Sequence, residues 1–380
     1  MTKAPVAAEL TWPQVLAFRL QRQHLAARAS KKDLARVVGA VGGAQAQLMS
    51  AAELQIAVRT DCKVTDVRKA LWTDRTLVKT WLMRGTLHLA RADDLPLYTA
   101  AMSSRWVRMR PSWLKFMQLN ESEFWKLEKE IGGALDGTPL TREELIAEVG
   151  KGKSPHVRQL LKSGWGGMLK PAARNGLLCF GPSRGHSVTF VNPREWLPGW
   201  REENPDTAIV EVARRYLRAY GPATKNDFGR WWGAWPGVGT AAWSALAEEV
   251  VPVAVDGMRL DLLASDLSAI KKARFDERVQ LLPVFDPYLM GHAKRDHLFD
   301  KVHSSKVSRT AGWISAVVLV DGRVAGTWTH TSNKSLSIRL TPFSRLGSDV
   351  LAHVKQRAGE LAAAMGLPDD DVKVAQAKVV

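Results

Sequence analysis

TLVKTWLMRGTLHLARADDL, residues 76–95, is the stretch that best indicates the kind of fold. It contains two strand-like runs, residues 77–83 and 86–91, on either side of Arg84-Gly85. Runs of this composition favour strands, and a short glycine-containing link between them is typical of a hairpin turn. Short helical segments precede the hairpin. The pattern therefore predicts a unit built of helices that ends in a β-hairpin.

The same order of elements recurs twice further along the chain. The second unit contains TREELIAEVG, a helical segment opened by the capping-box pattern Thr141-x-x-Glu144, and it ends in two strand-like runs within LLCFGPSRGHSVTFVNP. The third unit contains AIVEVARRYLRAYG, TKNDFGRWWG and VGTAAWSALAEE as helices. It ends in VVPVAVDGMRLDLLAS, where Asp256-Gly257 is a strong hairpin turn signal. No repeat of individual residues accompanies this order, so the repetition is architectural.

The last hundred residues differ from the three units. We interpret RVQLLPVFDPYLMGH, GWISAVVLVDGRVAGTWTHT and KSLSIRLTP as strands, with a hairpin turn at Asp321-Gly322. The final long segment, SRLGSDVLAHVKQRAGELAAAMG, has the pattern of a helix that ends at a glycine. These features predict a small β-sheet or β-barrel closed by one helix.

Helices followed by a hairpin describe a winged helix-turn-helix module, so we predict an α+β protein with three such modules in tandem and a C-terminal β-barrel or sheet with a closing helix. The alternative is a helical scaffold whose hairpins only cover its cores. The predicted boundaries place the modules at residues 10–94, 121–200 and 206–268, a basic and aromatic linker at 95–120, and the C-terminal domain at 275–380.

The charge balance indicates a polyanionic partner. Lysine and arginine number 54 against 38 aspartates and glutamates, which gives a net charge of +16, and the sequence pI is near 10.0. The excess is dispersed rather than concentrated in a tail, so it belongs to a folded surface, for which nucleic acid is the most common partner. A basic enzyme without a nucleic-acid substrate is the alternative. An RNA-binding function has no supporting motif such as an aromatic RNA-binding strand.

Other features of the composition indicate a cytoplasmic protein. No apolar run reaches the length of a membrane span, and the N-terminus lacks the apolar core of a signal peptide. The two cysteines, Cys62 and Cys179, form neither a metal-ligand cluster nor an evident disulfide framework. We therefore expect no membrane association, no metal and no cofactor.

Basic side chains in three places are candidates for DNA contact. SSRWVRMRPSWLKFM, residues 103–117, interleaves arginines with aromatic residues and has no acid, which suits a surface that tracks phosphates and stacks on bases. An ordinary linker helix has the same composition. The first hairpin and the serine-rich HSSKVSR segment supply the others. The predicted DNA-binding residues are Lys79, Arg84, His88, Arg91, Arg105, Arg108, Arg110, Lys306 and Arg309.

The segment GGAQAQ, residues 42–47, places two glutamines, Gln45 and Gln47, one residue apart. In a helix they would point about 200° apart, whereas in an extended segment they share a face. Ser50 and Glu53 form a capping-box pattern that predicts a helix starting near Ala51. We therefore expect an extended Gln-Ala-Gln segment (residues 45–47) with its alanine facing inward. The amides would hold a water or a base edge, or else cap a neighbouring helix.

The chain resembles the AlkZ/YcaQ-type winged-helix DNA glycosylases. The matching motifs are GGAQAQ, which corresponds to the family's Gln-aliphatic-Gln motif, TWLMRGTLHL in the first hairpin, and LLPVFDPYLMGH at the start of the C-terminal domain. The resemblance covers almost the whole chain. Ala46 is smaller than the aliphatic residue of many members.

The resemblance implies a monofunctional DNA glycosylase that excises N7-alkylated purines, with Gln45 and Gln47 as the catalytic pair. It also implies unhooking of interstrand crosslinks and self-resistance to alkylating natural products. An N7-alkylated purine is already a good leaving group, so the remaining task is to place a water and stabilise a cationic transition state. A glutamine positions a water without deprotonating it.

The second glutamine assigns the chain to one branch of this family. YcaQ-like members have an aspartate at that position, which can act as a general base, whereas this chain has Gln47 and so resembles the AlkZ-like branch. Glu53 and Asp61 are the nearest carboxylates in sequence, and neither matches a family motif. The partner implied is double-stranded DNA carrying alkylated or crosslinked purines. We expect a monomer that is nucleoid-associated when bound to DNA. A non-catalytic winged-helix transcription regulator is the alternative function.

Overall fold

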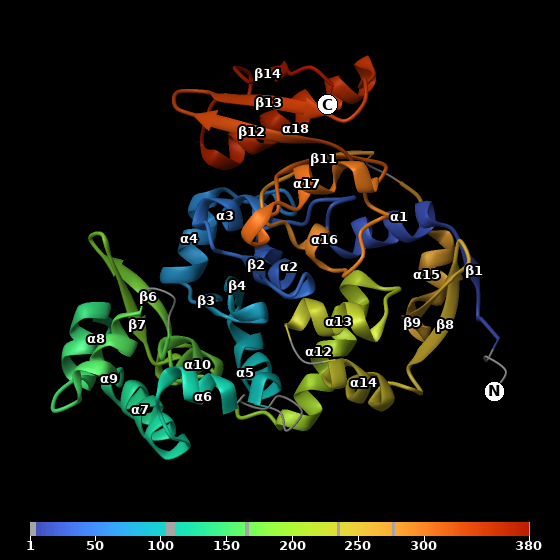
Figure 1. Cartoon of the computed structure of the whole chain (residues 1–380). Coiled ribbons are helices and arrows are strands. Elements are labelled where there is room, and N and C mark those ends of the chain that lie inside the picture. Colours follow the sequence, from blue (N-terminus) through green and yellow to red (C-terminus); the bar gives the residue numbers. More distant parts are fainter. Residues whose placement is uncertain (1–4, 104–110, 164–166, 234–235, 276–277, 380) are drawn as a thin grey trace.

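The computed structural model describes residues 5–103, 111–163, 167–233, 236–275 and 278–379. Groups of helices are separated by pairs of strands along the chain, so the protein is a mixed α+β structure (Figure 1). The described strands form three small sheets of three strands and one sheet of five. Each small sheet contains one of the three predicted hairpins, and all three hairpins are thereby confirmed.

The first unit contains the hairpin with which the sequence analysis began. Its strands pair antiparallel with Thr80 opposite His88, and the turn places both Arg84 (φ 58°) and Gly85 (φ 65°) in the left-handed region. Such turns match the twist of the flanking strands. The elements are α1 (Trp12–Arg22), α2 (Leu34–Ala40), β2 (Ala44–Gln45), α3 (Met49–Ala57), α4 (Val64–Trp72), β3 (Leu77–Trp81), β4 (Leu87–Arg91) and α5 (Leu95–Ser103).

The second unit has the predicted helices and hairpin. Thr141 caps α8 as the sequence predicts, since its side chain accepts a hydrogen bond from the Glu144 amide at 3.2 Å and Glu144 accepts one from the Thr141 amide at 2.8 Å. The elements are α6 (Pro111–Met117), α7 (Glu121–Ala134), β5 (Leu140–Thr141), α8 (Arg142–Val149), α9 (Pro155–Lys162), α10 (Leu169–Arg174), β6 (Cys179–Arg184), β7 (Ser187–Val191) and α11 (Pro193–Trp196).

The third unit contains a strand that the sequence analysis did not anticipate. β1 (Glu9–Leu10), from the N-terminus, pairs in parallel with β8, so the first residues of the chain complete the sheet of the third unit. The β8–β9 turn lies at Asp256-Gly257, as predicted. The other elements are α12 (Pro205–Tyr220), α13 (Lys225–Trp232), α14 (Pro236–Ala245), β8 (Val250–Val255), β9 (Met258–Leu263) and α15 (Leu267–Lys272).

The C-terminal domain is an open sheet covered by a helix, and the alternative of a barrel is wrong for the described residues. β10 and β14 are the edges of the five-stranded sheet and do not pair with each other. β14 follows the closing helix and pairs in parallel with β13. The elements are β10 (Val279–Leu282), α16 (Pro287–Met290), α17 (Ser304–Val307), β11 (Val317–Val320), β12 (Arg323–Ser332), β13 (Leu336–Pro342), α18 (Ser348–Met365) and β14 (Lys373–Gln376).

The segment RVQLLPVFDPYLMGH is only partly a strand, which corrects the prediction. Its strand stops at Leu282, Phe285 takes a positive φ of 59°, and Asp286 caps the short helix α16 by accepting a hydrogen bond from the Tyr288 amide at 2.9 Å. The apolar run was misread because a buried turn and a short buried helix carry the same apolar residues as a buried strand.

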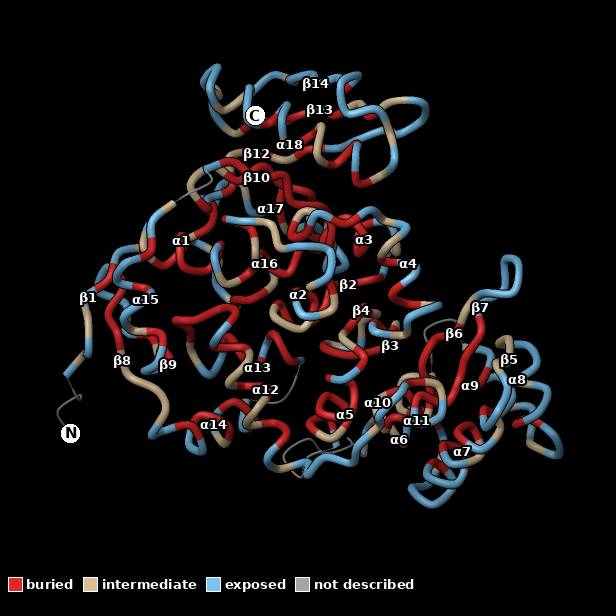
Figure 2. The backbone as a smooth tube through the Cα atoms, turned by 180° about the vertical axis from the view of Figure 1, so that it is seen from behind, coloured by how far each residue is buried: buried red, intermediate tan, exposed pale blue. Residues whose placement is uncertain are grey.

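Residues from different units pack into common hydrophobic cores. One buried cluster joins the first hairpin and α5 to α12, α13 and α14 of the third unit. α1 packs with the C-terminal domain, since Leu16 and Leu20 belong to one cluster with Leu282 and Phe285. Figure 2 shows buried backbone running continuously through this central region, with the second unit and β14 more exposed. The predicted domain boundaries stay a prediction.

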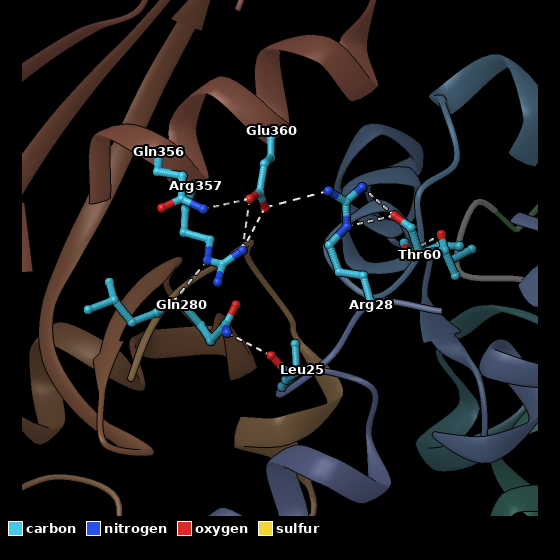
Figure 3. A network of polar contacts seen from close by, with 9 residues as sticks. Leu25, Arg28, Thr60, Gln280, Gln356, Arg357 and Glu360 are labelled. Carbon is cyan, nitrogen blue, oxygen red and sulfur yellow. Dashed lines mark hydrogen bonds and ion pairs between the residues drawn. The ribbon is translucent and has the colours of Figure 1, made fainter. Parts of the chain in front are cut away.

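A polar network joins α18 to the N-terminal part of the chain (Figure 3). Glu360 accepts hydrogen bonds from Arg357 at 2.8 and 2.9 Å and lies 3.5 Å from Arg28, which in turn donates to the carbonyl of Thr60 at 3.0 Å. Gln280 donates to the carbonyl of Leu25 at 2.6 Å. These contacts fix the closing helix against the first unit. Within the described part of the chain, no helix is long and apolar enough to cross a membrane.

Candidate active site

Two glycines bring the Gln-Ala-Gln segment against the third unit. Gly42 has a φ of 74°, and a Cβ there would lie 2.7 Å from the ring of Trp231. Gly43 has a φ of 109°, and a Cβ there would lie 3.1 Å from the carbonyl oxygen of Leu89. Both positions therefore need glycine, one for contact with α13 and the other for contact with β4. The glycine pair of the GGAQAQ motif therefore has a structural reason at each position.

The Gln-Ala-Gln segment is extended, as predicted. Gln45 pairs with His88 in an antiparallel bridge, the Ala46 amide donates to the Leu87 carbonyl at 2.7 Å, and Ala46 is buried. The predicted reason for the next helix start was wrong. α3 begins at Met49 with Leu48 as its N-cap, so Ser50 lies inside the helix.

The Ser50 capping box does not form because its acidic partner is used elsewhere. The carboxylate of Glu53 is buried and accepts hydrogen bonds from Arg68 at 2.6 and 3.1 Å. An ion pair with a guanidinium is a stronger interaction than a contact with a backbone amide. Asp61 is exposed and accepts a hydrogen bond from the backbone of Lys31. Neither carboxylate has a hydrogen bond to either glutamine.

Gln45 is fixed from two sides. Its side-chain oxygen accepts a hydrogen bond from Nη2 of Arg84 at 3.2 Å, and its backbone carbonyl accepts one from Nε2 of Gln55 at 3.1 Å. Arg84 is itself held by donating from Nη1 to the carbonyl of Trp231 at 2.5 Å. Because the Gln45 oxygen faces a guanidinium, its NH₂ group is the part left to donate to another molecule.

His88 lies beside Gln45 as a buried, neutral ring. Its Nδ1 is 2.9 Å from the carbonyl of Thr86, an acceptor, so Nδ1 carries the proton, and Nε2 accepts from Nη2 of Arg84 at 3.4 Å. Burial and the charge of Arg84 lower the pKa of His88 to about 3. Burial also lowers the pKa of Arg84 to about 10, so at neutral pH the guanidinium is charged and the imidazole is not.

The lowered pKa of His88 should make the protein less stable in mild acid. Unfolding returns the pKa to about 6.5, so below that pH the unfolded chain binds a proton that the folded chain does not. The contribution of His88 to stability is complete above pH 6.5, the pKa of the ring in the unfolded chain. It is lost progressively as the pH falls from there toward about 3, the pKa of the ring in the folded protein. In His88→Gln, the fall in unfolding free energy between about pH 5.5 and about pH 4.5 should be smaller by about 1.4 kcal/mol.

Urea unfolding followed by circular dichroism at each pH would measure this difference. The wild-type protein and His88→Gln are compared at the same pH values, so the carboxylates common to both cancel. A native spectrum of the variant at pH 7 establishes that it is folded. Identical pH dependence of the two proteins would contradict the neutral, buried state of His88.

Gln47 differs from Gln45 in being exposed. Its side-chain oxygen is 3.5 Å from the amide of Leu87, so its amide also turns toward the first hairpin. One glutamine is therefore fixed and covered, and the next is open to solvent beside it. Two neutral amides in this arrangement can donate to an oxygen or a water but cannot remove its proton.

The other predicted DNA-binding residues lie in different surroundings. Lys79 is half-buried, with its ammonium 5.2 Å from the centre of the Phe180 ring, and burial lowers its pKa. Arg91 pairs with Asp93 at 2.6 Å, and Lys306 lies 5.8 Å from the centre of the Phe343 ring. Arg309 is exposed. Arg105, Arg108 and Arg110 lie outside the described residues.

The structure adds residues that the sequence analysis did not assign to the site. Gln55 links Gln45 to the C-terminal domain by also donating to the carbonyl of Val284 at 3.0 Å. Arg59 donates to the carbonyl of Gln55 at 2.8 Å and forms a buried ion pair with Asp286 at 2.7 Å. The FDPYL motif, which contains Asp286, was the signal available in the sequence. No described group of three or more His, Cys, Asp or Glu side chains could hold a metal ion.

Comparisons with known proteins agree over most of the chain. A family model described as "DNA glycosylase AlkZ-like" matches residues 38–364. A curated relative from Streptomyces sahachiroi, named interstrand DNA cross-link repair glycosylase, is 35% identical over 371 residues, which cover 96% of this chain and 99% of the relative. The solved structure of Streptomyces sahachiroi DNA glycosylase AlkZ superposes with a TM-score of 0.87 at 34% identity, covering 97% of this chain and 100% of that one.

Proposed function

Because this chain belongs to the AlkZ-like DNA glycosylase family, we propose that it hydrolyses the N-glycosidic bond of N7-alkylated purines and unhooks interstrand DNA crosslinks. Family membership makes it a hydrolase of N-glycosyl bonds and favours this activity over a non-catalytic transcription regulator. The crosslinked substrate is proposed from the name of the curated relative. Self-resistance to an alkylating natural product is part of the same proposal.

The observation that carries the proposal is the fixed amide of Gln45 beside the open amide of Gln47. Arg84 holds the oxygen of Gln45 and leaves its NH₂ group free to donate to a water or a sugar oxygen. The exposed side chain of Gln47 would hold the same water from the other side. Placing a water near the anomeric carbon lowers the barrier by positioning, which suffices because the N7-alkylated base is already cationic and leaves as a neutral molecule.

We propose that Arg84 and His88 orient Gln45 rather than read a groove. His88 is buried, so contact with DNA would require it to leave its hydrogen bond to the Thr86 carbonyl. Arg84 spans Trp231, Gln45 and His88 from the tip of the hairpin. Its charge would still attract the DNA backbone electrostatically.

We propose that the three helix-and-hairpin units are winged helix-turn-helix modules that together accommodate a duplex. Lys306, within α17, and Arg309, which follows this helix, would contact phosphates. We also propose a monomer that acts in the cytoplasm on nucleoid DNA.

An excision assay on two substrates tests the function. A duplex with a single N7-methylguanine and a duplex crosslinked by a nitrogen mustard are incubated with the protein and then treated with alkali, which cleaves abasic sites. We expect strand cleavage at the methylated guanine and conversion of the crosslinked duplex to separable strands.

The two substrates separate the parts of the proposal. Product from N7-methylguanine alone would contradict crosslink unhooking and leave base excision in place. No abasic product from either duplex would contradict the proposed function and favour a non-catalytic DNA-binding role. The same duplexes without alkylation serve as controls for background cleavage.

A further inference from the structure

Two arginines that the sequence analysis did not single out, Arg230 and Arg295, lie beside the Gln45 site. Arg230 is on α13 and directly precedes Trp231, whose carbonyl accepts the hydrogen bond of Arg84. Arg295 is in the segment after α16, in the C-terminal domain. Figure 1 shows α13 directly beneath α16. The two arginines and Arg84 therefore come from three different parts of the chain.

A hydrogen bond ties the two elements together. The amide of Ala293 donates to Oδ1 of Asp227 at 2.9 Å, and Arg230 follows Asp227 by three residues on α13, which places both on one face of that helix. Arg295 follows Ala293 by two residues. Arg230 and Arg295 therefore lie near one contact between α13 and the segment after α16.

Neither arginine is neutralised by a carboxylate. Arg230 is exposed, and its side chain makes no hydrogen bond or ion pair with any described residue. Arg295 donates from Nη1 to the hydroxyl of Ser308 at 2.5 Å, while its buried Nε has no partner. The carboxylate of the nearby Asp227 binds other groups instead of these arginines. Besides the Ala293 amide, it accepts hydrogen bonds from the amide and the hydroxyl of Thr224 at 2.9 and 2.6 Å.

The positive charges of Arg230, Arg295 and Arg84 influence one another, which agrees with their being close together. Burial lowers the pKa of Arg295, and the positive charge of Arg230 lowers it further. The charge of Arg295 also contributes to lowering the pKa of Arg84, after the larger effect of burial. Like charges at short range raise the energy of the folded protein, and an anion placed among them relieves that repulsion.

We propose that Arg230 and Arg295 bind a phosphate of the DNA backbone next to the lesion, with Ser308 as an additional donor. Guanidiniums bind phosphate oxygens in pairs, and a duplex supplies phosphates along both strands. The site rests on the proposed DNA substrate. Bound there, a backbone phosphate would set the position of the damaged nucleotide relative to Gln45 and Gln47, since α13 carries both Arg230 and the contact to Arg84.

The test uses the full chain and an undamaged duplex. The dissociation constant is measured by fluorescence anisotropy between about 50 and 200 mM salt for wild type, Arg230→Gln, Arg295→Gln and the double variant. Each lost phosphate contact should weaken binding at every salt concentration and reduce the slope of log K against log salt by about 0.9. We expect the double variant to bind about tenfold more weakly at the lowest salt.

Matched controls separate a phosphate contact from a general loss of charge. Arg218→Gln removes an exposed arginine on α12 whose charge acts on the carboxylates Glu249 and Asp266, and it should leave the slope unchanged. Arg230→Lys should recover the slope. Because Arg230 is exposed and unpaired, Arg230→Gln remains folded and informative even if a substitution at Arg295 disturbs folding.

Three outcomes decide the proposal. Equal affinity and slope for wild type and Arg230→Gln would overturn it. If inorganic phosphate at constant ionic strength abolishes the difference between wild type and the double variant, phosphate competes with the duplex for these arginines and the proposal is supported. If wild type excises no base while the variants bind duplex more weakly, the phosphate site stands and the proposed function fails.

Discussion

Gln45→Ala and Gln47→Ala should each reduce the single-turnover rate of N7-methylguanine excision by about 100-fold, because each removes a hydrogen-bond donor from the proposed reaction site. Arg84 holds the amide of Gln45 in one orientation, and an alanine at this position has no amide to orient. Binding of the intact duplex should change little, since neither residue carries charge. The rate is measured with protein in excess over DNA, and the dissociation constant by anisotropy.

The control for the glutamine variants is Gln356→Ala, an exposed glutamine on α18. It should excise at the wild-type rate. Thermal melting of all three variants establishes that they are folded. Wild-type excision by both Gln45→Ala and Gln47→Ala would remove the Gln-Ala-Gln segment from the catalytic site and leave the fold assignment intact. A loss of DNA binding equal to the loss of rate would instead assign the two glutamines to substrate binding.

Asp286→Asn should lower the free energy of unfolding by about 3–5 kcal/mol, because it leaves a buried guanidinium without its counter-charge. Arg59 and Asp286 are both almost fully buried, and two hydrogen bonds of 2.8 and 2.7 Å join their side chains. The asparagine keeps the shape of the side chain, so the change is chiefly one of charge. Urea unfolding followed by circular dichroism measures the difference.

The exposed pair of Arg323 and Asp300 is the control for this variant. Their side chains are 45% and 74% exposed at a distance of 2.7 Å, and water screens such a pair, so Asp300→Asn should unfold close to wild type. Equal unfolding midpoints for Asp286→Asn and Asp300→Asn would contradict the importance assigned to the buried pair.

The buried pair also connects the FDPYL motif to the catalytic segment. Asp286 holds Arg59, Arg59 donates to the carbonyl of Gln55, and Gln55 donates to the carbonyl of Gln45. Asp286 is thus a positioning residue that acts on Gln45 through two others. Two family motifs far apart in sequence therefore serve one site.

The local elements could be predicted because their signals are short-range. The turn at Arg84-Gly85, the capping box at Thr141 and the extended Gln-Ala-Gln segment depend on residues within a few positions of one another. The Ser50 capping box failed for the opposite reason. Its partner Glu53 is bound by Arg68, fifteen residues away, and no local pattern reveals that competition.

The sequence by itself determined most of the element types, the three hairpins, the family and the extended form of the Gln-Ala-Gln segment. Only the tertiary structure decided that Arg84 turns inward to hold Gln45 beside the buried His88, and that the segment carrying Arg295 packs against α13, which carries Arg230. The physical reason is that backbone conformation follows from neighbouring residues, whereas the burial of a polar side chain depends on which distant surface packs against it. Here that surface is α13, whose Trp231 contacts Gly42 and Arg84 from the third unit.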